Sequence, residues 1–94
     1  MKTHFIKTWP AYFERVLEGQ KEFEVRKNDR DYQVGDILVL EWFNPDKSNN
    51  IYQSPDRLFR EVTYILHGGQ FGIEHGYCVM QLGITEKSKS QQVF

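Results

Sequence analysis

Residues 19–26, with the sequence Gly-Gln-Lys-Glu-Phe-Glu-Val-Arg, mark the change from helical to extended structure in this chain. The apolar residues before this stretch recur with the period of an amphipathic helix. Within it, Phe23 and Val25 alternate with charged side chains, which is the two-residue repeat of a half-buried strand. We therefore predict a strand over residues 21–27 with an apolar face toward the core and a charged face toward solvent.

The preceding helix is bounded by Pro10, which is favourable in a first helical turn, and by Gly19, which suits a helix C-terminus. Thr8 is in position to cap the N-terminus of this helix. One face of the helix is apolar and consists of Tyr12, Phe13, Val16 and Leu17.

Further extended segments are predicted at residues 4–8, 37–43, 58–66 and 77–82, and residues 44–57 are expected to form a long hairpin connection. This order of one helix among five strands predicts an α+β fold. We expect a mixed or antiparallel sheet that curls into a small β-barrel, with the helix over one opening. Residues 1–84 form this single domain, and the polar residues 85–94 are expected to be a mobile tail.

Composition excludes several classes of protein. Twelve Lys and Arg residues oppose 13 Asp and Glu, so the net charge of −1 speaks against a broad electropositive face for nucleic acid but allows a compact, nucleotide-sized site. The single cysteine, Cys78, excludes an intramolecular disulfide, and no set of Cys and His residues has the spacing of a zinc site. No apolar run approaches the ~20 residues of a membrane span, so we expect a cytoplasmic protein that binds no membrane. We also expect no bound metal and no cofactor.

Lys21, Glu24 and Arg26 are the densest set of candidate functional residues. A partly desolvated lysine near an arginine can act as a base, and a neighbouring carboxylate can steer it or orient a water. The arginine can bind a phosphate or carbonyl oxygen through its planar fork. The alternative interpretation is an ion pair on a solvated strand face, which contributes about 0–1 kcal/mol to stability.

The glycine-rich loop at residues 67–76 is the second candidate, because its backbone can approach a ligand closely. Gln70 and the exposed side of Phe71 are the recognition groups if the loop lines a cleft, and Gly69 is a further candidate ligand-binding residue. The alternative is a wide loop between strands that needs positive φ angles. The loop is neither a P-loop nor a dinucleotide fingerprint. Exposed aromatic rings could hold a base by stacking, and the candidates for this role are Trp9, Tyr32 and Tyr64.

The pattern Gly19-x-Lys21-x-x-Glu24-x-Arg26, after a short strand and helix, resembles the signature of the ASCH domain of the PUA-like superfamily. The segment Val34-Gly35-Asp36-Ile37-Leu38 fits a strand entry common in such domains. Over residues 3–84 the chain is similar to a short ASCH-like family of bacteria and their phages. The resemblance implies a PUA-like β-barrel.

The resemblance also implies a cleft beside the helix that binds RNA or a nucleotide, with Lys21, Glu24 and Arg26 in its wall. Some ASCH proteins are amidohydrolases that deacylate N4-acylcytidine by means of a lysine and a threonine three residues later. This chain keeps the lysine as Lys21 but has Glu24 in place of the threonine, which favours binding over hydrolysis. A third hypothesis is a phage-encoded module that binds a host protein, and we expect a monomer or weak dimer.

Overall fold

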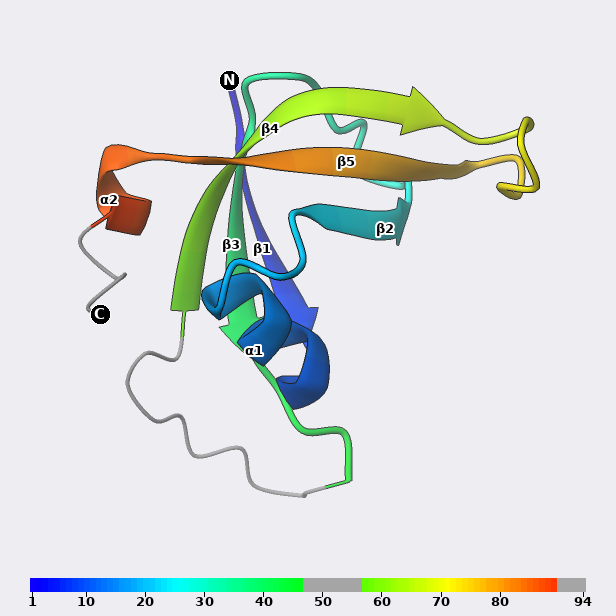
Figure 1. The fold of residues 1–94 in the computed structure, drawn as a ribbon. Helices are drawn as coiled ribbons and strands as arrows, with labels where there is room; N and C mark the ends of the chain where they lie inside the picture. Colours follow the sequence, from blue (N-terminus) through cyan, green and yellow to red (C-terminus); the bar gives the residue numbers. More distant parts are fainter. Residues whose placement is uncertain (47–56, 90–94) are drawn as a thin grey trace.

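The computed structural model describes residues 1–46 and 57–89, and it contains one mixed five-stranded sheet (Figure 1). In spatial order the strands are β1 (Thr3–Thr8), β3 (Ile37–Trp42), β4 (Arg57–His67), β5 (Tyr77–Ile84) and β2 (Phe23–Lys27). The β1 and β3 strands pair in parallel, and the other neighbours pair antiparallel. A bulge between Val62 and Tyr64 in the long strand β4 adds to the twist, and the sheet curls into a half-barrel. The predicted α+β class is confirmed.

Helix α1 (Pro10–Leu17) packs Phe13 and Val16 into the hollow of the sheet. Trp9 is the N-cap residue, and it makes no side-chain capping bond, so the prediction that Thr8 caps this helix is wrong. Thr8 is still part of β1, where its carbonyl accepts a hydrogen bond from the Phe43 N–H. The chain therefore leaves the strand one residue later than the capping pattern suggests. The core also contains Ile6, Leu38, Leu40, Leu58, Met80 and Leu82.

Side chains of β2 and of the turn that follows it reach the edge strand β1. The Arg26 guanidinium donates through Nη2 to the carbonyl of Lys7 at 3.0 Å, and Arg30 donates through Nη1 to the carbonyl of Phe5 at 2.7 Å. Both carbonyls lie on the side of β1 that faces away from β3. Two arginines thus close the half-barrel where no backbone ladder is formed among the described residues.

The segment expected to be a tail without structure begins instead with the short helix α2 (Glu86–Lys89). The backbone N–H of Ser88 donates to Thr85 Oγ1 at 3.0 Å, and the Ser88 hydroxyl contacts the carbonyl of Phe59. These polar contacts hold a segment that has little apolar surface to bury. Residues 90–94 of the predicted tail and residues 47–56 of the predicted connection lie outside the described residues. In the described part of the chain, no helix is long and apolar enough to cross a membrane.

Candidate functional site

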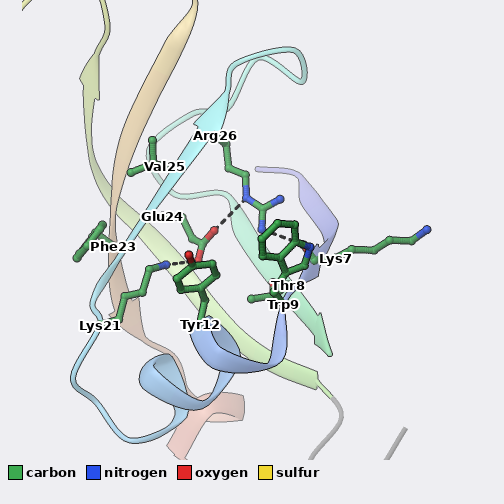
Figure 2. A pocket seen from close by; sticks show the side chains of 9 residues that line it. All are labelled: Lys7, Thr8, Trp9, Tyr12, Lys21, Phe23, Glu24, Val25 and Arg26. Carbon is green, nitrogen blue, oxygen red and sulfur yellow. Dashed lines mark hydrogen bonds and ion pairs between the residues drawn. The ribbon is translucent and has the colours of Figure 1, made fainter. Parts of the chain in front are cut away.

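A pocket of about 530 Å³ opens between the end of β1, the start of α1 and strand β2 (Figure 2). Its size is within the usual range of about 300–1,000 Å³ for small-molecule sites. The three motif residues Lys21, Glu24 and Arg26 all line it, so the structure brings together the residues that the sequence pattern singles out. The remaining lining residues are Lys7, Thr8, Trp9, Tyr12, Phe23 and Val25.

Glu24 is the buried centre of this site, with 3% of its surface exposed. One carboxylate oxygen accepts a hydrogen bond from Lys21 Nζ at 2.6 Å, and the other accepts from Arg26 Nε at 2.9 Å. The carboxylate therefore holds both cations in fixed positions at the pocket wall. Charge-assisted bonds to both oxygens compensate for the desolvation that burial of a carboxylate requires.

The orientation of β2 is the opposite of the one predicted. Phe23 and Val25 are 46% and 50% exposed, whereas Glu24 points into the half-barrel. The prediction of a buried apolar face and a solvated charged face for this strand is thus wrong. The charged face of β2 turns inward because Glu24 pairs with two cations, Lys21 and Arg26.

Aromatic side chains form the second wall of the pocket. The rings of Trp9 and Tyr12 are stacked, with centroids 6.2 Å apart and planes at 19°, and about half of each residue is exposed. The Lys21 ammonium lies 5.9 Å from the centroid of Tyr12 and 5.1 Å from that of Phe23. Cation–π contacts therefore add to the ion pair in positioning this ammonium. The exposed rings offer a flat apolar surface beside fixed charges.

The pocket is locally electropositive although the chain as a whole carries a net charge of −1. Three cationic side chains, Lys7, Lys21 and Arg26, line it against the single carboxylate of Glu24. Lys7 also lies over the ring of Phe43, with its Nζ 4.8 Å from the ring centroid. This excess of two positive charges suits a small anionic ligand.

The glycine-rich loop lies apart from the pocket, at the tip of the β4–β5 hairpin (Figure 1). Gly69 has φ +91°, and a Cβ on Gly68 would collide with the backbone carbonyls of Glu74 and Tyr77. The side chain of Gln70 donates to the carbonyl of His67 at 2.9 Å within the same turn. These contacts account for the glycines as requirements of a tight turn, and the structure does not bring Gly69 and Gln70 to the motif residues.

The three aromatic candidates have different surroundings. Trp9 lines the pocket, whereas Tyr64 is 59% exposed on β4 and is not part of the lining. Tyr32 is 2% exposed and packs edge-to-face against His4, with ring centroids 4.7 Å apart. Tyr32 is therefore a core residue, and burial is the main cause that raises the pKa of its hydroxyl.

Sequence reasoning did not identify Lys7, Thr8 and Tyr12 as members of the site. Tyr12 was assigned to the apolar face of α1, and no spacing rule connects residues of β1 to a motif that begins at Gly19. The position of Pro10 offers a usable signal, because a helix that starts directly after a strand places its first turn beside the end of that strand. Within the described residues, no cluster of His, Cys, Asp and Glu could hold a metal ion.

Comparison with known proteins assigns the chain to a family. Residues 3–82 match the family described as "Domain of unknown function (DUF3850)", which is most of the chain, and the protein belongs to this family. The chain is also similar to the "Uncharacterized 12.9 kDa protein in GpA 3′region" of Escherichia phage P2, with 52% identity over 42 residues. That match covers 44% of this chain and 38% of the phage protein, so it spans less than half of either.

Proposed function

We propose that this member of the DUF3850 family is a binding module for a single nucleotide, either free or within RNA, in the pocket beside α1. The observation that carries this proposal is the meeting of an exposed aromatic pair, Trp9 and Tyr12, with cations fixed by a buried carboxylate in a pocket of nucleotide size. The resemblance of the Gly19–Arg26 motif to ASCH domains, and thereby to PUA-like barrels, supports the same proposal.

The two walls match the two halves of a nucleotide. A base can stack on the exposed ring of Trp9, and such stacking contributes about 1–3 kcal/mol per base. Arg26 uses Nε for Glu24 and Nη2 for the carbonyl of Lys7, and its remaining N–H groups can bind a phosphate oxygen. The limited positive charge fits one or two phosphates better than a long RNA backbone.

Arg26→Gln is expected to weaken the binding of uridine monophosphate about tenfold, because a charge-assisted contact to phosphate is lost. Isothermal titration calorimetry at low salt measures this effect. Arg15→Gln is the matched control: it removes the same charge from the exposed face of α1, where Arg15 pairs with Glu18, and its affinity should stay within twofold of the parent. Equal affinity for the parent and the Arg26 variant would overturn the proposal.

Hydrolysis of an N4-acylcytidine is the second candidate function, and the contact between Lys21 Nζ and Glu24 in the pocket is the observation that favours it. Glu24 could activate a water, but both of its oxygens already bind cations. We therefore expect no release of acetate from N4-acetylcytidine at high protein concentration, as followed by chromatography. Release that disappears in Lys21→Ala would instead identify the protein as an amidohydrolase.

A further inference from the structure

Strand β2 has one backbone edge that no other strand covers among the described residues. Its ladder with β5 is fixed at both ends, because the Leu82 N–H donates to the carbonyl of Glu22 and the Asn28 N–H donates to the carbonyl of Gly76. In an antiparallel pair the backbone groups of alternate residues point toward the partner. The N–H and C=O groups of Glu24 and Arg26 therefore face β5.

The backbone groups of the alternate residues Phe23, Val25 and Lys27 consequently point away from β5. Phe23 and Val25 line the pocket although their side chains point away from Glu24 (Figure 2). The side of β2 opposite β5 faces β1 across this pocket, so the free backbone edge of these two residues borders the wall. Lys27 lies on the same edge but outside the pocket lining, so it provides an internal comparison.

We propose that the backbone N–H and C=O of Val25 read the base of the bound nucleotide, an inference that rests on the proposed function. In an extended strand, the N–H and C=O of one residue point to the same side and form an adjacent donor and acceptor. The Watson–Crick edge of a nucleobase offers the complementary acceptor and donor. Bonding to such an edge satisfies two backbone groups that the fold leaves without a ladder partner.

Neighbouring groups restrict what can occupy this edge. Arg26 crosses from β2 to the Lys7 carbonyl of β1, which limits the open length of the edge to the pocket. A short planar group fits this space, and Trp9 and Tyr12 provide its stacking surface. An extended peptide would continue along the edge to Lys27, so the response of Lys27 separates the two kinds of ligand.

The first test uses the full chain, uniformly labelled with nitrogen-15, and uridine monophosphate as the probe. We expect the Val25 amide resonance to move downfield on titration, because its N–H gains a carbonyl acceptor, while the Lys27 amide stays unchanged. N3-methyluridine monophosphate lacks the imide proton that the Val25 carbonyl needs, so it should bind about 3- to 10-fold more weakly. This inference would be overturned if resonances of Trp9 and Arg26 shift, that of Val25 does not, and both probes bind with equal affinity. The proposed function would still stand after that result.

The second test is Val25→Pro, which removes the N–H without breaking the ladder to β5. Lys27→Pro is the matched control, since it removes an N–H from the same edge outside the pocket. Weaker binding of uridine monophosphate should be confined to the Val25 variant, because only that variant loses a donor to the base. The variant keeps its carbonyl, so it should still prefer uridine over N3-methyluridine monophosphate. If neither probe binds the parent protein, the proposed function itself fails and this inference fails with it. The probe comparison on the parent decides the matter even if the proline variant does not fold.

Discussion

Asp36→Ala is expected to lower the free energy of unfolding by about 3 kcal/mol, because the side chain is a buried acceptor of three hydrogen bonds. Asp36 is 1% exposed and accepts from His4 Nε2 at 2.8 Å, from the Lys2 N–H at 2.9 Å and from the Gln33 N–H at 3.0 Å. The alanine would leave three polar groups without this partner. These bonds join the start of β1 to the loop that leads into β3.

The ionisation of Asp36 makes this contribution depend on pH. Burial acts to raise the pKa of Asp36, but the hydrogen bonds from His4, Lys2 and Gln33 outweigh it and hold the pKa below its usual value. A carboxyl with a lowered native pKa contributes stability that is fully present above its unfolded pKa of about 3.9. This stability is lost as the pH falls through the lower native pKa.

Urea denaturation at a series of pH values measures both effects. Below about pH 4 the parent should lose stability more steeply than Asp36→Ala, so the two curves converge in acid. Asp29→Ala removes an exposed aspartate from the same loop and should change stability by less than about 0.5 kcal/mol. A constant difference between the parent and Asp36→Ala from neutral pH down to pH 2 would contradict the assignment of this carboxylate.

The sequence was sufficient for the order of the elements because each has a clear period and clear boundaries. Pro10 and Gly19 bound the helix, and the glycine-rich turn separates β4 from β5. The order of the elements could be predicted because it depends only on local periodicity and on turn chemistry.

The site was predictable only in part, because periodicity does not determine which face of a strand is buried. An alternating pattern places Phe23 and Glu24 on opposite faces, but the ion pairs that turn Glu24 inward require Lys21 and Arg26 to converge in three dimensions. The glycines that make residues 67–76 a candidate binding loop are the same residues that a tight turn requires. Whether such a loop reaches a pocket depends on the length of the hairpin that carries it.

Arg60 is a third buried charged residue, besides Glu24 and Asp36, and its side chain reaches from β4 to the end of α1. It is 3% exposed, and it donates to the carbonyl of Val16 at 3.3 Å and to the carbonyl of Phe59 at 2.9 Å. Burial lowers the pKa of this guanidinium. Among the described residues Arg60 has no ion-pair partner, so backbone carbonyls compensate for the desolvation of its guanidinium. One of these carbonyls lies in the last turn of α1, where a cation is favourable.

Arg60→Ala is therefore expected to lower the free energy of unfolding by about 2–3 kcal/mol, because it leaves a cavity and removes the bond to the end of α1. Arg60→Met keeps most of the buried volume and avoids burying a charge, so it should cost less than the alanine. Arg57→Ala on the same strand breaks an exposed ion pair with Glu41 and should cost no more than about 1 kcal/mol. Urea denaturation measures the free energy of unfolding of the three variants. Equal losses for Arg60→Met and Arg60→Ala would show that the charge and its carbonyl bonds matter more than the packing of the side chain.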